Sequence, residues 1–395
     1  MGPAAAFRLI GSRAFAPYFF GNALSASGTW FQNLAAAILV FRLTHSALLL
    51  GVLSFVQFAP TLFLAPWTGS AADRFDRRRL LLVTQPVAAI LSATLALITH
   101  LDVVTAPVVI LFGLGQGLTT AFSTPAQQAL FVSLVPREDV TSAVGLNSMT
   151  FNIARAAGPA LAGATVGTLG IAAAFAVNSC SYLLFTLALV FVRPRRQERP
   201  ESTRLRESID LLRREPRLAV ALAVVAAVGF TSDPINTLAP AFAHAFDRPD
   251  TTAGYIIGVF GAGAVTAAFV LAGRQASRER TIVTLTVFGG GVAAFALSPF
   301  LPLALACLFV AGFGYLASNT AATSFLQLGV AENQRGRIMA LWSIAFLGLR
   351  PFASLVDGAI AASFGVRVAG VVLSIPALLA AVMLARWRPR TRPSP

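Results

Sequence analysis

The chain has 395 residues, of which 56% are apolar and only 12% are charged. Soluble domains carry about 25% charged residues, so this composition excludes an ordinary water-soluble protein and favours one solvated by lipid. The net charge of +14 comes entirely from arginine, because the chain has no lysine, and the arginines sit between apolar runs rather than in a basic–aromatic nucleic-acid module. We therefore predict an integral membrane protein that binds no nucleic acid.

Long uncharged apolar runs recur along the chain, and residues 80–98 and 103–136 contain no charged side chain. Runs of about 18 or more such residues are typical of membrane-spanning helices. Lipid offers backbone N–H and C=O groups no partner, so the helix is the expected form. The sequence predicts an all-α fold with twelve spans, at residues 16–41, 48–70, 79–100, 105–133, 141–167, 171–192, 218–244, 253–273, 281–299, 302–329, 338–361 and 367–386.

Arginine placement orients these spans. With both termini and the even-numbered loops on one side, that side holds 25 arginines and the other side holds three, Arg42, Arg248 and Arg367. Cytoplasmic loops of membrane proteins carry the excess of basic residues. We predict a multi-pass protein of the cell membrane with both termini in the cytoplasm.

One long polar segment, residues 193–217, divides the spans six to six. We predict an N-terminal six-helix bundle at 1–192, a cytoplasmic linker at 193–217, and a C-terminal six-helix bundle with a short basic tail at 218–395. The two halves also echo each other, since "LFGLGQG" at 111–117 recurs as "LFVAGFG" at 308–314. Internal repeats of this kind are typical of transporters.

Polar side chains form stripes in the first, fourth, seventh and tenth spans. Asn22, Ser25, Thr29 and Gln32, for example, are separated by three or four residues and share one helix face. Such faces need protein or water in a bilayer, so they predict a central cavity; hydrogen bonding between helices is the alternative. The expected substrate-cavity residues are Asn22, Ser25, Thr29, Trp30, Gln32, Gln116, Thr120, Ser123, Asn236, Asn319 and Thr323.

Four charged residues, Arg155, Asp233, Arg350 and Asp357, fall inside predicted spans. A charge at the bilayer centre costs about 2.5–3.5 kcal/mol on insertion scales, so a function is expected for such residues. Asp233 is the candidate titrating carboxylate, the alternative being a permanent salt bridge to an arginine. Asp357 is expected nearer the outer end of its span and partly hydrated. Arg155 and Arg350 occupy similar positions in the two halves, which indicates a shared structural, gating or substrate-binding role.

The loop "GSAADRFDRRR" at 69–79 resembles the signature loop of the major facilitator superfamily. The resemblance implies that Gly69 allows close helix packing, that Asp73 helps to lock a cytoplasmic gate, and that Arg74, Arg77 and Arg78 complete a charge network. The fifth predicted span is similar to the antiporter motif of exporters in this superfamily, with small residues and a proline that would permit close packing and a bend. The matching positions are Gly145, Ala154, Gly158, Pro159 and Gly163.

Further stretches, among them "FRLTHSALLLG" and "LNSMTFNIARAAGPALAG", resemble the enterobactin-exporter and macrolide-efflux branch. This implies a secondary active exporter of amphipathic small molecules, such as drugs or siderophore-like metabolites, that works by alternating access. Protons are the candidate coupling ion, although Gly113 stands where proton-coupled drug antiporters commonly carry an arginine, and the first and fourth spans contain no acid. The expected partners are a small-molecule substrate and the lipid bilayer, and the chain is expected to be a monomer.

Other functions remain as alternatives. An importer or a lipid flippase could use the same fold, and a non-transporting membrane sensor could use the cavity to bind a ligand. No nucleotide-binding loop, metal cluster or catalytic set can be assembled from the sequence. We therefore expect no enzyme activity, no cofactor and no bound metal.

The position of Asp233 leads to a first prediction. If this carboxylate couples export to proton entry, Asp233→Asn should abolish proton-driven efflux while leaving expression intact, because an amide cannot release a proton in the working pH range. Efflux measured across an imposed pH gradient checks this. Transport that persists with an unchanged pH dependence would show the idea to be wrong.

Overall fold

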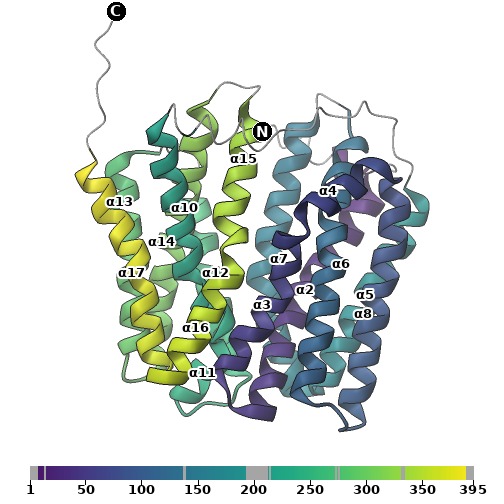
Figure 1. Ribbon diagram of the computed structural model, residues 1–395, viewed down its shortest axis with the longest axis horizontal. Coiled ribbons are helices and arrows are strands. Elements are labelled where there is room, and N and C mark those ends of the chain that lie inside the picture. Colours follow the sequence, from purple (N-terminus) through teal and green to yellow (C-terminus); the bar gives the residue numbers. More distant parts are fainter. Residues whose placement is uncertain are drawn as a thin grey trace, which may run out of the picture. The chain divides into compact units, whose positions relative to one another are not determined.

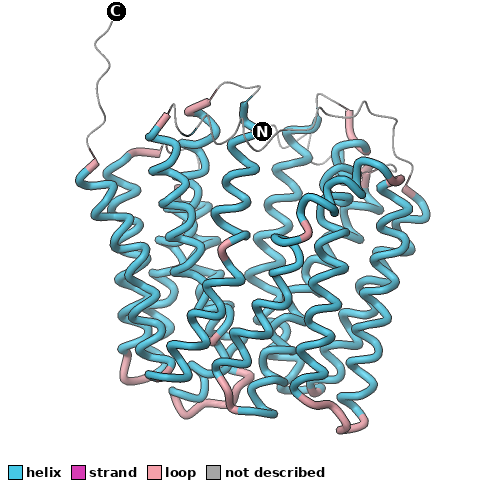
Figure 2. The backbone as a smooth tube through the Cα atoms, in the orientation of Figure 1, coloured by secondary structure: helices cyan, strands magenta, loops and turns pink. Residues whose placement is uncertain are grey.

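The computed structural model describes residues 8–12, 15–136, 139–192, 212, 215–271, 274, 276–330 and 334–387. Helices account for almost all of these residues, and no strand occurs among them (Figure 2). The all-α prediction is therefore confirmed. Most of the predicted linker at 193–217 lies outside the described residues.

The helices follow the predicted spans in order (Figure 1). In the N-terminal half they are α2 (Ala16–Thr44), α3 (Ala47–Phe63), α4 (Ala65–Arg74), α5 (Arg77–His100), α6 (Ala106–Ser133), α7 (Val140–Leu169) and α8 (Ile171–Phe191). In the C-terminal half they are α10 (Pro216–Thr237), α11 (Ala239–Ala245), α12 (Thr252–Val270), α13 (Arg278–Leu297), α14 (Leu301–Leu328), α15 (Arg335–Ser343), the π-helical turn η3 (Ile344–Gly348), α16 (Arg350–Phe364) and α17 (Val366–Arg386).

Ten helical stretches among the described residues are long and apolar enough to cross a membrane, and the pair α3 and α4 adds an eleventh if the two form one span. The remaining predicted span corresponds to α7. Its 30 residues would extend about 45 Å at 1.5 Å per residue, which is sufficient to cross a bilayer. Asn147, Asn152 and Arg155 interrupt the apolar sequence of α7, so a twelfth span stays a prediction.

Three of the predicted spans are interrupted helices. The span at 48–70 is bent by 57° between α3 and α4, and the span at 218–244 is interrupted between α10 and α11. Each break precedes a proline at the second position of the next helix, Pro66 or Pro240, whose nitrogen cannot donate to the carbonyl four residues earlier. The span at 338–361 contains the π-helical turn η3 immediately before Leu349 and Arg350.

Backbone packing divides the chain into two compact units. The first comprises residues 1–200 together with 239–258, and the second comprises 201–238 together with 259–395. The predicted boundary between the halves differs from this grouping only in the segment 239–258, which holds α11 and the first turns of α12. A bidentate ion pair joins that segment to α2. Arg42 donates through Nη2 to Asp250 Oδ1 over 2.8 Å and through Nε to Asp250 Oδ2.

Within each unit the helices have the same neighbours. In the first unit, α5 packs on α8 and α2 packs on α7 and α8; in the second, α13 packs on α17 and α10 packs on α16 and α17. The last two helices of each half also meet at a single glycine, Gly170 with a φ of 85° and Gly365 with a φ of 90°. A side chain is strained at these angles, so glycine permits the one-residue junction in both halves. The two units are therefore pseudo-symmetric in their internal packing.

A pair of arginines repeats this symmetry at the start of the helix that forms the third predicted span of each half. Arg78, at the start of α5, donates to the carbonyls of Leu189 and Val190 at the end of α8, both over 2.7 Å. Arg278, at the start of α13, donates to the carbonyls of Leu384, Ala385 and Trp387 at the end of α17, over 2.7–3.0 Å. The last carbonyls of a helix have no partner within the helix, and a cation near them also complements the helix dipole. Each arginine therefore caps the C-terminus of the last helix in its half and joins that helix to α5 or α13.

These arginines generate a second prediction. Arg78→Leu and Arg278→Leu should each lower the melting temperature of the purified protein, because each leaves helix-terminal carbonyls without a donor. The effects should be roughly additive in the double variant, since the two arginines share no partner. Thermal unfolding followed by tryptophan fluorescence provides the measurement. Unchanged melting in both single variants would contradict a capping role.

Candidate functional site

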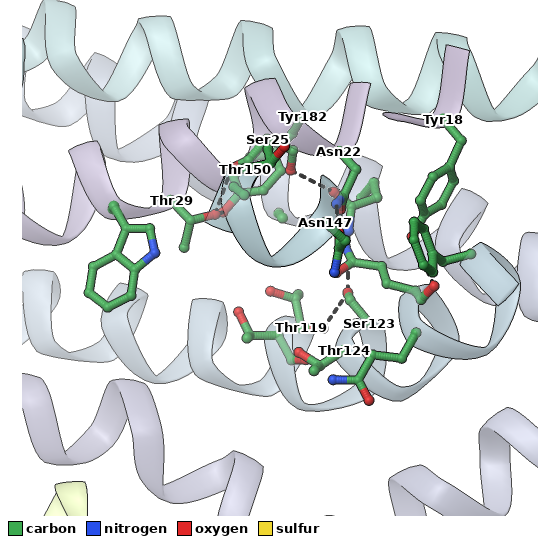
Figure 3. A pocket seen from close by; sticks show the side chains of 18 residues that line it. Tyr18, Asn22, Ser25, Thr29, Thr119, Ser123, Thr124, Asn147, Thr150 and Tyr182 are labelled. Carbon is green, nitrogen blue, oxygen red and sulfur yellow. Dashed lines mark hydrogen bonds between the residues drawn. The ribbon is translucent and has the colours of Figure 1, made fainter. Parts of the chain in front are cut away.

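A cavity of about 210 Å³ lies inside the first unit. Its walls come from α2, α5, α6, α7 and α8, and Figure 3 shows hydroxyl and amide side chains pointing into it. None of the side chains that line it is charged. The lining residues are Tyr18, Asn22, Ser25, Ala26, Thr29, Trp30, Gln85, Ala88, Thr119, Thr120, Ser123, Thr124, Gln127, Gln128, Phe131, Asn147, Thr150 and Tyr182.

The polar stripe of α2 forms one wall of this cavity. Asn22 donates through Nδ2 to Oδ1 of Asn147 over 3.3 Å, which links α2 to α7. The hydroxyl groups of Thr29 and Tyr182 lie 2.9 Å apart and join α2 to α8. Since these positions are three to four residues apart along α2, one helix face presents them all to the same space.

The stripe of α6 forms the facing wall, and α5 joins the two. Figure 3 shows Asn22, Ser25 and Thr29 opposite Thr119, Ser123 and Thr124. Gln85 of α5 accepts from Ser25 through Oε1 over 3.4 Å and donates through Nε2 to Ser123 over 3.3 Å. Gln85 is buried, so its amide holds its orientation through protein partners. A ligand would meet a hydrogen-bonding surface that is already ordered.

A second set of polar residues lies beside the cavity and holds the helices together. Gln32 Oε1 accepts from Ser92 and from Asn178, both over 2.7 Å. Gln116 Nε2 donates to Ser92 Oγ over 2.8 Å and to the carbonyl of Ala88 over 3.2 Å. All four of these polar side chains are buried. In the stripes of α2 and α6 both interpretations therefore hold, because one part of each lines the cavity and another part joins helices.

The predicted cavity residues are thus divided by the structure. Asn22, Ser25, Thr29, Trp30, Thr120 and Ser123 line the cavity. Gln32 and Gln116 belong to the buried network and border only a small adjoining space of about 40 Å³. The cavity also contains Tyr18, Gln85, Asn147, Thr150 and Tyr182, which were not predicted from the sequence because they come from sparsely polar stretches. Asn147 and Thr150 lie three residues apart on α7, and this helical spacing could have identified them as sharing one face.

The polar residues predicted in the second unit have more local partners. Asn236 donates to the carbonyl of Ser232 one turn earlier, over 2.9 Å. Thr323 accepts from Trp342 Nε1 over 2.9 Å, and that indole stacks on Phe346 with ring centroids 5.0 Å apart. The side-chain oxygen of Asn319 is buried without a hydrogen-bond partner. Within this unit, these residues do not converge on one cavity.

The intramembrane charges of the second unit do converge. Arg350 Nε lies 3.0 Å from Asp233 Oδ1, and Thr237 donates to Asp233 Oδ2 over 2.9 Å. Asp357 lies near both charged groups and is 0% exposed. The expectation that Asp357 is partly hydrated is wrong, because α16 packs this face against α10 and α17. Arg155, in contrast, lies half-buried in α7 of the first unit.

Comparisons with known proteins identify the family. The model of a family described as transmembrane secretion effector matches residues 4–393. The chain belongs to this family of major facilitator superfamily transporters. An enterobactin exporter from Shigella boydii is 24% identical, covering 95% of this chain and 93% of the relative. A staphyloferrin A transporter from Staphylococcus aureus is 30% identical over 172 residues, 43% of each protein.

Solved structures agree on the fold. A bacterial homologue of the human lysosomal transporter Spinster superposes with a TM-score of 0.78 at 15% identity, covering 98% of this chain and all of that one. A D-xylose–proton symporter gives a TM-score of 0.72 at 15% identity, with 95% and 98% coverage. These similarities confirm the major facilitator fold. The family and fold are those of transporters rather than enzymes.

In the signature loop of this transporter, two arginines bind backbone carbonyls of the described residues. Arg77 donates to the carbonyl of Ala129 over 3.4 Å, and Arg78 caps α8. Arg74 is exposed, and a Cβ placed on Gly69 would meet no atom within 4 Å, so Gly69 makes no close helix contact. The side chain of Asp73 lies outside the described part of the structure. A gating role for this loop stays a prediction.

The small residues of α7 do create close helix contacts. A Cβ on Gly158 would lie 3.0 Å from the carbonyl oxygen of Ser27 in α2. A Cβ on Gly163 would lie 2.7 Å from the carbonyl oxygen of Thr251 and 3.0 Å from the Cα of Gly254 in α12. Such distances leave no room for a side chain, so the close packing expected of this segment is present. Pro159 is buried within α7, and Gly145 lies in its first turns; their effect on motion stays a prediction.

A matched pair of variants on α6 tests the division between cavity and network. Gln116→Leu should lower the melting temperature, because it leaves buried partners without a hydrogen bond at a cost of about 1–3 kcal/mol. Thr120→Val, one turn further on, should leave stability unchanged and weaken ligand binding. Thermal unfolding with and without ligand separates the two effects. Equal destabilisation by both substitutions would contradict the division.

Proposed function

We propose that this transporter exports amphipathic small molecules by alternating access. The relative that covers 95% of the chain is named an enterobactin exporter, and another relative is named a staphyloferrin A transporter. Both names describe transporters of siderophores. The small-residue contacts of α7 agree with the exporter motif seen in the sequence. Drugs or siderophore-like metabolites are therefore the substrate classes that we propose.

The neutral polar cavity of the first unit carries this proposal. It offers side-chain amides from Asn22, Gln127, Gln128 and Asn147 and many hydroxyl groups, but no lining charge. Trp30 and Phe131 add aromatic surface to the lining. Ligand sites combine such apolar walls with a few placed polar groups that fix orientation. We propose that the part of the substrate bound here is uncharged, aromatic or apolar on one side, and rich in hydroxyl or amide groups.

Three further elements belong to the proposal. The 25-to-3 distribution of arginines supports an orientation with both termini in the cytoplasm, in the cell membrane. The buried cluster of Asp233, Arg350 and Asp357 supports protons as the coupling ion. A single chain holds both the cavity and the charged cluster, which supports a monomer as the working unit.

Transport by everted membrane vesicles provides the test. Everted vesicles from cells that express the protein should accumulate at least one compound from a panel of dyes, macrolides and catecholates, and a pH gradient should increase the uptake. Thr120→Val and Trp30→Ala should reduce the uptake because they alter the cavity wall. Thr168→Val, at an exposed position at the end of α7, serves as the matched control and should transport normally.

The same assay separates the alternatives. Uptake confined to right-side-out vesicles would contradict export and favour an importer. Movement of labelled lipid in place of every panel compound would favour a flippase. Binding without accumulation in either orientation would favour a sensor.

A further inference from the structure

The buried cluster of the second unit contains more acid than base. Asp233 is 1% exposed and Asp357 is 0% exposed, and Arg350 is the basic residue that pairs with Asp233. Two ionised carboxylates with one guanidinium would leave an uncompensated negative charge in the protein interior. An isolated buried carboxylate is so unfavourable that it takes up a proton instead.

The hydrogen-bond partners of the two carboxyl groups indicate which of them carries the proton. Both oxygens of Asp233 have donors, Arg350 Nε at 3.0 Å and the Thr237 hydroxyl at 2.9 Å. Neither oxygen of Asp357 has a hydrogen-bond partner, and its carboxyl lies near that of Asp233. Ionised carboxyl groups only accept, whereas a protonated one also donates. A hydrogen on Asp357 therefore removes the unpartnered buried charge and gives this carboxyl a donor for the neighbouring Asp233 carboxylate.

Among the described residues, the other charged groups of the surrounding helices lie near helix ends. Helices α13, α14, α15 and α17 and the turn η3 pack on α10 or α16. Apart from the cluster, the charged residues of these helices are Arg217, which pairs with Glu215 over 3.0 Å; Arg278, Glu279 and Arg280 at the start of α13; Arg335 and Arg337 at the start of α15; Arg367, which donates to the carbonyls of Ala296 and Ser298; and Arg386 at the end of α17. α14 contains no charged residue.

A π-helical turn sets the position of the arginine. η3 ends at Gly348, and Leu349 and Arg350 follow directly. The turn packs closely on α10, where a Cβ on Gly229 would lie 3.2 Å from the carbonyl oxygen of Phe346. A π-turn contains one more residue than an α-turn and frequently occurs at functional sites. Without the extra residue, Arg350 would be rotated by about 100° about the helix axis, given 3.6 residues per turn.

We propose that Asp233, Arg350 and Asp357 form a single-proton site in which Asp357 carries the proton and donates it to the Asp233 carboxylate. The proton is held while the cluster is dry, because its loss would leave two carboxylates facing one arginine. It can leave when water reaches Asp357 and solvates the new charge. This site would be the coupling site of the proposed exporter, and in that respect the inference rests on the proposed function.

Infrared spectroscopy of the purified protein in lipid nanodiscs tests the site without transport. At neutral pH the wild-type protein should show the carbonyl band of one protonated carboxylic acid, since exposed acids are ionised there. Asp357→Asn should remove the band. Asp233→Asn should also remove it, because one acid then balances one arginine. Arg350→Gln should raise the band towards twice its intensity, since neither acid then has a cation to balance it.

Two controls accompany the infrared measurement, an acid outside the cluster and a folding check for each variant. Asp250→Asn removes an acid from the ion pair with Arg42 outside the cluster and should leave the band unchanged. Asp357→Asn retains a donor for Asp233 and closely matches a protonated acid in shape, so it should fold; melting temperatures verify folding for every variant. Absence of the band in the wild type, or its persistence in both Asp357→Asn and Asp233→Asn, would overturn the proposal.

Vesicle transport separates this proposal from the proposed function. Transport that continues in a protein without the band would refute the proton site and leave export in place. The band without transport of any panel compound would refute export and leave the proton site in place. If both hold, Asp357→Asn should abolish the stimulation of uptake by a pH gradient while ligand binding persists.

Discussion

The structure of this transporter depends on one constraint, which is that polar groups in a bilayer find partners only within the protein. Helices satisfy the backbone internally, but the last carbonyls of each helix and every polar side chain still need donors or acceptors. Arg78 and Arg278 supply such donors to α8 and α17. Gln32, Ser92, Gln116 and Asn178 satisfy one another between helices. Where a polar group lacks a protein partner, as Asp357 does, a bound proton becomes the simplest solution.

The two halves share their packing but not their chemistry. Helix neighbours, the glycine junctions and the capping arginines repeat from one half to the other. The first half places a neutral polar cavity among its helices, whereas the second half places two acids and an arginine there. Such a division would let one half bind substrate through hydrogen bonds while the other responds to protons. A charged cavity would compete for protons with the proton site that we propose, which the neutral lining of the first half avoids.

Close contacts and local helix breaks add the irregularities that a moving transporter needs. α7 approaches α2 at Gly158 and α12 at Gly163, where backbones touch without side chains between them. The bend between α3 and α4 and the π-turn η3 interrupt otherwise regular spans. Non-helical backbone at membrane depth is tolerated only where protein or water satisfies it. These interruptions therefore mark segments whose backbone groups depend on neighbouring protein or water and not on lipid.

The sequence by itself determined the helical class, the order of the spans, the pseudo-symmetric halves and the family. These features were readable because apolar runs and arginine positions act locally along the chain, and because the motif at 69–79 is contiguous. Only the tertiary structure decided which stripe residues meet a cavity. Gln32 and Thr29 share a helix face, yet Gln32 pairs with Asn178, 146 positions away, while Thr29 lines the cavity. Only the tertiary structure, likewise, placed Asp357 against Asp233 and removed it from water. Partners so distant along the chain leave no local pattern, because packing between helices, and not the helix period, brings them together.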